Sequence, residues 1–537
     1  MFEDAMNSHF AQEDFEKYFC RARERPLRPL ILLSLPPLAR FAVKIFHLQL
    51  YDRACPVPGR KSLFRFLLLS CALLFSSTLH AQTDDSTRQL AHDTFKQLIE
   101  INTTDSVGNV TTAAEAMAQR FRDAGFPEND IYIGGPNDRK KNLVVRLHGS
   151  SRHKPVLLIG HLDVVEARRE DWTTDPFQFV EKDGYFYGRG TQDMKDGAAI
   201  MIATLIQFKK ENFVPDRDLI LALTADEEDG KFNGVDWLLK NHRDLVNAEF
   251  VINTDDLTLW TKGGKPEVME IDASEKIYSD YQFVVTDSGG HSSLPKPQNP
   301  IYELSAALVR LQHYKFPVEL SDVTRAYYER MSKVQTGQRA TDMKAIVKNP
   351  PDHTAETRLS QNIDDNAMLH TTCVATRVEA GHANNALPQR AAAIVNCRIL
   401  PGHTKQEVRD TLLRVIADPA VAIHYVGSDG VVSDKVPATP VFTHHPLRQE
   451  VLNTVEKVTN QMWPGTPVIP MMARGASDGV FTTAAGLPTY VVAGVAVDRN
   501  DDREHGRDER VGVKSFYDGL EFWDRFLRTL TTSGVHD

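Results

Sequence analysis

Short apolar runs alternate with amphipathic segments along residues 86–256 and again along residues 489–530. The apolar runs are continuous and rich in Val, Leu and Ile, as expected of strands that are buried on both faces of a sheet. These predicted strands are 142–149, 154–161, 218–226, 249–256 and 489–496. The predicted helices are 86–101, 111–126, 197–212, 234–242 and 513–530. Their alternation predicts an α/β fold, with a sheet covered by helices on both faces.

A different pattern begins near Tyr278. Its predicted strands (281–293, 371–381, 391–402) and helices (301–314, 405–417) suggest a separate α+β unit, and the polar stretch 321–368 suggests a helical insert within it. A chain of 537 residues is also too long for one compact core. We therefore predict a catalytic domain in two parts, 82–275 and 435–537, interrupted by an inserted α+β lid or dimerisation domain at 276–434.

Residues 1–81 differ from the rest of the chain. Arg60, Lys61 and Arg65 precede a short apolar run at 66–75, and small or polar residues then lead to Ala81. This order is typical of a secretory signal peptide cleaved after Ala81; an uncleaved membrane anchor is the alternative. Because a signal peptide should begin a chain, we predict that the residues before Val57 are an artefactual leader. The mature protein is then exported, either periplasmic or secreted, and free of the membrane after cleavage.

Composition narrows the choice of partners. The formal net charge of -10 argues against nucleic acid, which favours a basic face. Only Cys373 and Cys397 remain after residue 81, too few for a zinc cluster of cysteines or a disulfide framework. They flank a predicted hairpin centred near Asn385 and could be neighbours across its two strands. The sequence is compatible with a single disulfide and with a pair of free thiols.

Polar side chains follow three of the predicted strands directly. His161 and Asp163 come after the apolar run VLLIG of the second strand, residues 226–228 after LILALTA of the third, and Asp255 after FVINT of the fourth. In open α/β sheets, sites form at the carboxyl ends of strands. One such residue would be an ordinary loop residue, but three strand ends with metal-ligand side chains predict a site.

These residue types suit a hydrolytic metal centre. Histidine nitrogen and carboxylate oxygen are the usual ligands of catalytic zinc, and the two oxygens of Asp193, just before a predicted helix, can bridge two metals. Asp163 is placed to accept the proton of the other imidazole nitrogen of His161. Glu227 and Glu228 point in different directions, so that one can bind metal while the other moves protons.

Two assignments are less constrained by the residues alone. Asp255 is the preferred ligand after its strand, but Asp256 competes with it because sequence does not set the turn. His505 lies in a polar loop far along the chain, where a lone histidine is usually a surface residue.

Several motifs occur in one order along the chain. They are GHLDVV, GRGTQDMKDG, TADEE, GGHSSLP, ANNALPQRA, RILPG, GASDG and EHGRDERV. Between about residues 88 and 532 the chain thereby resembles the co-catalytic di-zinc peptidases, which include glutamate carboxypeptidases, aminoacylases, carnosinases and succinyl-diaminopimelate desuccinylases. The combination is specific, although each motif alone is not.

The resemblance implies a role for each matching residue. The five metal ligands would be His161 and Asp255 on one zinc, Glu228 and His505 on the other, and Asp193 between them. The catalytic residues would be Glu227 as general base, Asp163 orienting His161, and His291 stabilising the oxyanion, in many members across a dimer interface. The substrate contacts would be Asn385, Arg398 (for the substrate carboxylate) and Gly475.

The sequence NTDD departs from the family pattern at Asp255, because a Glu followed by glycines is common there. The resemblance further implies two Zn²⁺ ions, with cobalt or manganese as alternatives, and a homodimer.

The predicted function is a metal-dependent hydrolase that cleaves an amide bond next to a free carboxylate. The substrate would be a small peptide, for a carboxypeptidase or dipeptidase, or an N-acyl amino acid, for a deacylase. A catalytically silent binding protein on the same scaffold is a remote alternative, since every ligand position and the base carry competent side chains.

Overall fold

The computed structural model describes residues 83–256, 258–427, 429–437, 447–473 and 475–532. The predicted leader, the signal peptide and the proposed start near Val57 lie outside the described residues. Within these ranges, no helix combines the length and the apolar character needed to cross a membrane.

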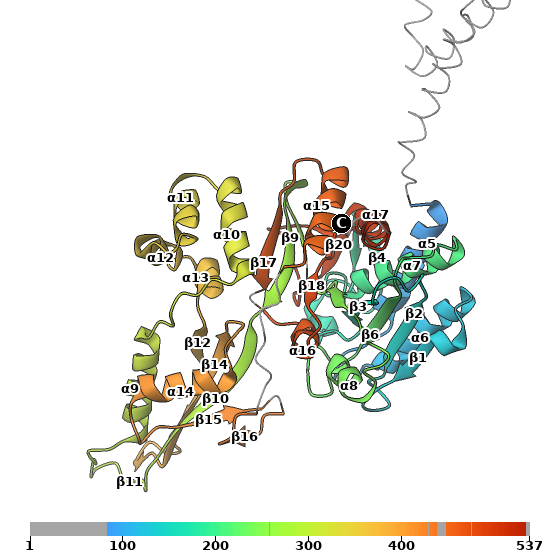
Figure 1. The fold of residues 1–537 in the computed structure, drawn as a ribbon. Coiled ribbons are helices and arrows are strands. Elements are labelled where there is room, and N and C mark those ends of the chain that lie inside the picture. The colour runs from blue at the N-terminus through green and yellow to red at the C-terminus, as the bar shows by residue number, and fades with distance from the viewer. Residues whose placement is uncertain (1–82, 257, 428, 438–446, 474, 533–537) are drawn as a thin grey trace, which may run out of the picture. The chain divides into compact units, whose positions relative to one another are not determined.

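A ten-stranded sheet forms the core of the larger part of the fold (Figure 1). Its strands follow the order β1-β2-β6-β3-β7-β18-β9-β8-β19, and β17 pairs with β9 outside that path. Neighbours β6, β3, β7 and β18 are parallel, whereas β1, β2 and β6 are antiparallel. The strands are β1 (Ile131–Gly134), β2 (Asn142–Leu147), β3 (Val156–His161), β6 (Leu219–Thr224), β7 (Phe250–Asn253), β8 (Leu259–Lys262), β9 (Lys265–Glu275), β17 (Val468–Ala473), β18 (Thr489–Val491) and β19 (Ala496–Asp498).

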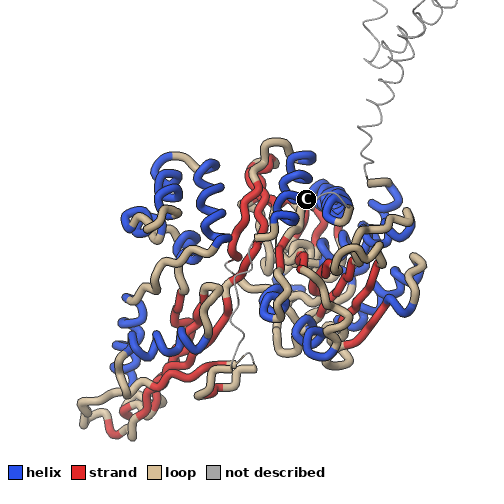
Figure 2. Tube along the Cα trace, viewed as in Figure 1, coloured by secondary structure: helices blue, strands red, loops and turns tan. Residues whose placement is uncertain are grey.

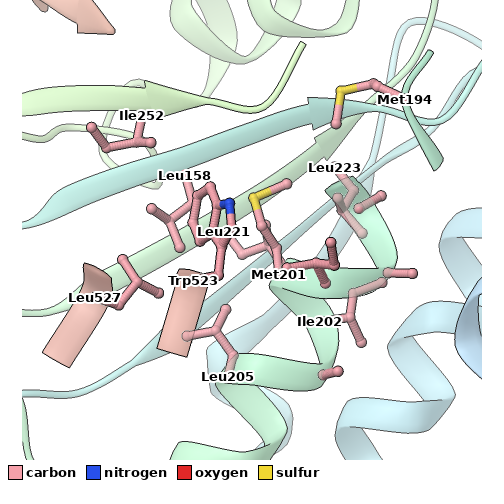
Figure 3. Packing of buried hydrophobic residues seen from close by; sticks show 14 of the residues in the cluster. Leu158, Met194, Met201, Ile202, Leu205, Leu221, Leu223, Ile252, Trp523 and Leu527 are labelled. Carbon is pink, nitrogen blue, oxygen red and sulfur yellow. The ribbon is translucent and has the colours of Figure 1, made fainter. Parts of the chain in front are cut away.

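Both faces of this sheet are buried, which explains the continuously apolar strands. In β3, Leu158 packs into the core beneath α5, α7 and α17, whereas Leu157 and Ile159 pack on the opposite face with Leu238 of α8. Side chains alternate between the faces of a strand, so each face receives its own apolar set. Figure 3 shows Leu158 close to Trp523 in the first of these cores.

The helices that cover the two faces of the ten-stranded sheet pack on it with their apolar sides. The sequence patterns placed most of them correctly, but not α15 and α16. They are α5 (Asp85–Glu100), α6 (Val110–Asp123), α7 (Lys195–Lys210), α8 (Gly234–Asn241), α15 (Gln449–Met462), α16 (Gly479–Ala484) and α17 (Val513–Leu530), with the 3-10 turns η1 (Glu128–Asp130) and η2 (Arg169–Asp171).

A second, five-stranded sheet, here called the lid sheet, has the order β12-β14-β10-β15-β16. Helices α9 and α14 cover one of its faces, and Asn299 begins α9 by accepting the N–H of Ile301 at 2.9 Å. Its elements fall within the range 276–434 predicted for the inserted unit. They are β10 (Ile277–Thr286), β12 (Thr372–Ala380), β14 (Arg390–Ile399), β15 (Ala422–Val426), β16 (Val432–Ser433), α9 (Pro300–His313) and α14 (Lys405–Ile416).

The predicted helical insert is present between the lid helix α9 and strand β12 (Figure 2). Its helices are α10 (Asp322–Val334), α11 (Gly337–Ile346), α12 (His353–Leu359) and α13 (Ile363–Leu369). Tyr328 and Met331 of α10 share an apolar core with Ile469 and Met471 of β17. The insert lies between two elements of the lid in sequence, but it packs against the ten-stranded sheet.

Two small sheets complete the described fold. β20 (Arg510–Gly512) pairs with β5 (Tyr185–Tyr187), which pairs with β4 (Val180–Lys182); β11 (Gly290–His291) pairs with β13 (Ala386–Leu387). Cys373 and Cys397 face each other across β12 and β14 and form a disulfide. Of the two states that the sequence left open for these cysteines, the structure has the bonded one.

Candidate metal centre and active site

Loops at the carboxyl ends of neighbouring strands carry the predicted ligands. His161 ends β3, Glu227 and Glu228 follow β6, and Asp255 follows β7. β3 lies between β6 and β7, so these loops meet at one edge of the sheet. Asp193 joins them from the loop before α7.

The carboxylate of Asp193 lies between two imidazoles. Its Oδ1 is 2.9 Å from His161 Nε2, and its Oδ2 is 2.7 Å from His505 Nε2. Glu228 Oε1 is 3.2 Å from the same nitrogen of His505, and Asp255 Oδ1 is 3.3 Å from Nε2 of His161. The five predicted ligands thus lie together as two ligand groups that share Asp193; we call them the ligand cluster.

The hydrogen bond of His161 Nδ1 fixes which nitrogen is available. Nδ1 lies 2.9 Å from the backbone oxygen of Asp163, which can only accept, so Nδ1 carries the proton. In the neutral ring, Nε2 then presents its lone pair toward Asp193 and Asp255. This is the orientation that a metal-binding histidine needs.

Asp163 differs from its predicted geometry. Its carboxylate lies 3.8 Å from His161 Nδ1, so its backbone oxygen orients the ring. The carboxylate instead accepts the N–H groups of Glu227 at 3.2 Å and Glu228 at 3.1 Å. The sequence could not reveal this, because the contact depends on where the turn after β6 comes back to the strand end. Asp163 therefore holds the turn that carries both glutamates.

The two aspartates after β7 point to different neighbours. Asp255 faces His161, whereas the carboxyl group of Asp256 interacts with Asp272, a buried residue of β9. Burial first, and Asp256 second, raise the pKa of Asp272 well above its ordinary value. Of the two candidates left open by the sequence, Asp255 is the one that lies in the ligand cluster.

The electrostatics of the ligand cluster fit bound cations. Burial, and then Asp255, raise the pKa of Glu227 well above its ordinary value, and burial raises the pKa of Glu228. Hydrogen bonding to Asp193 and then Glu228 raises the pKa of His505 to about 11. Among the described residues, Glu228 Oε1 is one of the buried side-chain oxygens with no well-aligned hydrogen bond. Closely spaced carboxylates and imidazoles are the donor set of a dinuclear metal site.

Four further acids that have no role predicted from the sequence lie beside this site. Asp478, in the GASDG motif, accepts a hydrogen bond from Thr224 Oγ1 at 2.9 Å, and burial raises its pKa to about 7. Glu275, at the end of β9, accepts the N–H of Ser477 at 2.8 Å, and burial raises its pKa to about 7. Glu504 lies with Asp193 and His505 in a group of possible metal ligands, and burial raises its pKa to about 8. The fourth acid, Glu509, contacts the loop that carries Asp193. Asp478 lies in the motif GASDG, and Glu504 and Glu509 lie in EHGRDERV, but no sequence signal pointed to Glu275.

A cavity of about 200 Å³ opens beside the ligand cluster. Asp163 and Glu228 line one part of it, and Thr103, Val110 and Val164 line another. Space for a small chemical group is therefore present next to the ligand Glu228.

His291 and Asn385 lie elsewhere in the chain. They sit at the β11–β13 pair, where Ser292 N–H donates to Asn385 O at 3.1 Å. β10 leads there from Glu275, and its ten residues span roughly 30 Å at about 3.3 Å each. Figure 1 shows β11 at the opposite end of β10 from β9. Within one chain, this pair of residues is therefore remote from the ligand cluster.

The other two predicted substrate contacts lie nearer the junction of the two sheets. Arg398 pairs with Tyr278, directly after the start of β10, and its guanidinium lies 4.8 Å from the centre of that ring. Gly475 lies in an exposed loop after β17, two residues before Ser477, which binds Glu275. Both residues lie near the point where the lid sheet connects to the ten-stranded sheet.

Comparison with known proteins gives a family and a fold. The sequence model of Peptidase family M20/M25/M40 matches residues 157–529. The N-fatty-acyl-amino acid synthase/hydrolase PM20D1 of Homo sapiens is 27% identical over 390 residues, which cover 71% of this chain and 74% of that protein. The solved M20 family metallo-carboxypeptidase Sso-CP2 from Sulfolobus solfataricus has a TM-score of 0.60 at 17% identity, over 82% of this chain and 99% of that one. Human carnosine dipeptidase 1 has a TM-score of 0.53 at 16% identity, over 83% and 97% of the two chains.

Proposed function

The chain belongs to Peptidase family M20/M25/M40 and is a metal-dependent hydrolase; from this premise, we propose that it cleaves an amide bond next to a free carboxylate with two zinc ions. The observation that carries the proposal is the position of Asp193, with one oxygen at each of two histidines. Each histidine has a second carboxylate beside it, Asp255 or Glu228. The same donors would also accept cobalt or manganese.

The mechanism assigns a separate task to each acidic group. When bound, the zinc ions would polarise the scissile carbonyl and lower the pKa of a water molecule. Glu227 takes the proton of the attacking water and delivers it to the leaving amine. Asp163 keeps Glu227 in place by accepting its backbone N–H. Arg398 pairs with the carboxylate of the substrate, which places the scissile bond at a fixed distance from the lid sheet.

The oxyanion donor comes from a second copy of the chain in this proposal. His291 is remote from the ligand cluster of its own chain, so its predicted role requires a homodimer. β12 is an edge strand of the lid sheet with exposed Val374 and Val378, and it supports pairing between copies. Light scattering after size exclusion tests the dimer; a monomer would remove His291 from the catalytic role.

Two substrate classes fit the same metal centre. The metallo-carboxypeptidase and dipeptidase neighbours share the fold and favour a peptidase. The relatives named N-fatty-acyl-amino acid synthase/hydrolase favour an N-acyl-amino-acid hydrolase, and that class is the second candidate. Both classes release an amino acid with a free carboxylate, so their common feature is the carboxylate beside the scissile bond.

A matched pair of substrates separates the two classes. Glycyl-phenylalanine and N-acetyl-phenylalanine share the scissile bond and the leaving amino acid, and they differ by one ammonium group. The panel also holds N-succinyl and N-fatty-acyl phenylalanine and longer peptides, each with and without a chelator. Chelator-sensitive cleavage is expected, with the preferred member of the pair giving the class. Absence of cleavage across the panel by metal-loaded protein would favour the silent-scaffold alternative.

Export through a signal peptide ending at Ala81 is part of the proposal. It is supported by the basic, apolar and small-residue order of residues 60–81. N-terminal sequencing of native protein is expected to begin at Gln82. A mature chain that begins before Val57 would contradict it.

A further inference from the structure

Two loops that are far apart in the sequence meet beside the bridging carboxylate. The first runs from β5 to α7 over residues 188–194 and carries Asp193. The second precedes β20 and carries His505. β20 pairs with β5, with Arg510 opposite Tyr187, and this pairing brings the two loops together.

The carboxylate of Glu509 lies between these loops and is fully buried. Its Oε1 accepts the N–H of Gln192 at 2.6 Å and the N–H of Asp193 at 3.2 Å. Its Oε2 accepts the N–H of Gly190 at 3.1 Å, and its backbone oxygen accepts the N–H of Gly188 at 3.2 Å. One residue thereby provides acceptors for four backbone N–H groups of the loop that carries Asp193, and buried N–H groups need such partners.

Arg189 connects Glu509 to the second loop. Its Nη1 donates to Glu509 Oε2 at 2.6 Å. Its Nη2 donates to the backbone oxygens of His505 at 3.3 Å and Gly506 at 3.1 Å. The guanidinium lies 5.0 Å from the ring centre of Trp172, which covers it. The ion pair of Arg189 and Glu509 therefore holds the backbones of two metal ligands at once.

We propose that Glu509 is a positioning residue for the metal centre, an inference that rests on the proposed function. Asp193 and His505 are 312 residues apart, yet their side chains meet at 2.7 Å. The Glu509–Arg189 pair fixes the N–H of Asp193 and the carbonyl of His505, and so sets where the shared oxygen lies. Holding both loops before the metals arrive removes the ordering cost from metal binding.

Only a carboxylate satisfies the donors on both sides. Glu509 Oε1 faces two backbone N–H groups, and Oε2 faces Arg189 and a third N–H group. In Glu509→Gln, the amide NH₂ group must face one of these sets, donor against donor. A buried donor without an acceptor is destabilising, so the loop should shift away from the amide.

The test compares full-length Glu509→Gln with Glu249→Gln. Glu249 also accepts from two arginines, Arg448 at 2.7 Å and Arg217 at 3.4 Å. It directly precedes β7, at the end opposite to the ligand Asp255, and serves as the matched control. Zinc affinity is measured by competition with a chelator of known affinity. The spectrum of the cobalt-loaded protein reports the coupling of the two ions, and melting temperatures are taken with and without metal.

The expected result for Glu509→Gln is zinc affinity at least tenfold weaker than wild type, reduced coupling of the cobalt ions and a smaller rise of Tm on metal addition. Glu249→Gln should lower Tm and keep the wild-type zinc affinity. If Glu509→Gln does not fold, Arg189→Lys replaces it, with weakened zinc affinity expected.

If folded Glu509→Gln keeps the zinc affinity and the cobalt spectrum of the wild type, the role of Glu509 is overturned and the proposed function stands. The same holds if Glu249→Gln weakens zinc binding as much as Glu509→Gln does. A wild-type protein that binds no metal would contradict the proposed function itself and this inference with it.

Discussion

At the scale of residues, two adjacent glutamates have different surroundings. Glu228 Oε1 lies 3.2 Å from His505 Nε2 and close to Asp193, within the ligand cluster. Glu227 lies on the side of His161 and Asp255. A carboxylate that binds metal is a poor base, so the mechanism needs one glutamate of each kind. Asp163 accepts the backbone N–H groups of both.

Glu227→Gln should bind metal with unchanged stoichiometry and lose turnover. The amide keeps the shape of the side chain but cannot take the proton of the attacking water, so kcat is expected to fall by about 10²–10⁴-fold. Metal analysis and steady-state kinetics on the preferred panel substrate measure both effects. Glu115→Gln, which changes an exposed carboxylate of α6, is the control and should keep wild-type kcat. Substantial turnover in Glu227→Gln would remove Glu227 from the role.

The sequence was enough to predict which residues form the ligand cluster, but not which groups hold those residues in place. The strand-end position of His161 and the paired acids after β6 follow from apolar runs that stop at polar residues. The carboxylate of Asp163 binds backbone N–H groups, and Glu509 contacts a loop more than 300 residues away. Such contacts are set by tertiary packing, which local patterns do not encode.

At the scale of elements, continuous apolar runs predicted the central strands well. β1, β8, β9 and β17 were missed, and β19 was reached only at its first residue. Residues 265–275 mix charged and apolar side chains, and Pro470 interrupts the apolar run of β17. β9 nevertheless matters most for the layout, since it leads directly into β10 of the lid sheet. The residue between them is Lys276.

Lys276 ties this junction to the helical insert. Its Nζ donates to the backbone oxygens of Ala367 and His370, both at 2.7 Å, at the carboxyl end of α13. The side chain is buried, and burial first, then Arg398, lower its pKa from the ordinary 10.5 to about 7. The unfolded chain therefore binds a proton on Lys276 at a higher pH than the folded chain does.

The consequence is a pH-dependent stability. Between pH values of 10.5 and about 7, the unfolded state is protonated at Lys276 and the folded state is not, so the free energy of unfolding falls as pH is lowered through that window. Lys276→Met should make this fall smaller, as measured by denaturant unfolding at several pH values. Lys240→Met, at an exposed lysine of α8, should keep the wild-type slope. Equal slopes in wild type and Lys276→Met would contradict the account.

At the scale of the whole molecule, His291 and the ligand cluster of the same chain lie far apart because β10 runs between them. We therefore propose that the histidine comes from the partner copy in a homodimer. In a symmetric dimer, both active sites then depend on residues of both chains.

Mixing two inactive variants tests this arrangement. His291→Ala lacks the oxyanion donor, and Glu227→Gln lacks the base, so each homodimer should be inactive. In a mixed dimer, one site has an intact Glu227 and receives an intact His291 from the other chain. Random exchange of subunits should restore about a quarter of wild-type activity. The control is a mixture of the two variants after each homodimer has been crosslinked, which should stay inactive because its subunits cannot exchange. If activity does not return after verified exchange, His291 does not act in the active site of the partner chain.

The central claim is that the ligand cluster holds two catalytic metal ions, and titration of the metal-free protein tests it most directly. Zinc is added in known equivalents while binding and hydrolysis of the preferred panel substrate are followed together. The account predicts no hydrolysis without metal, saturation at two equivalents per chain, and a lost equivalent in His505→Ala. Hydrolysis that persists after complete metal removal, or full activity at a single bound equivalent of zinc per chain, would contradict it.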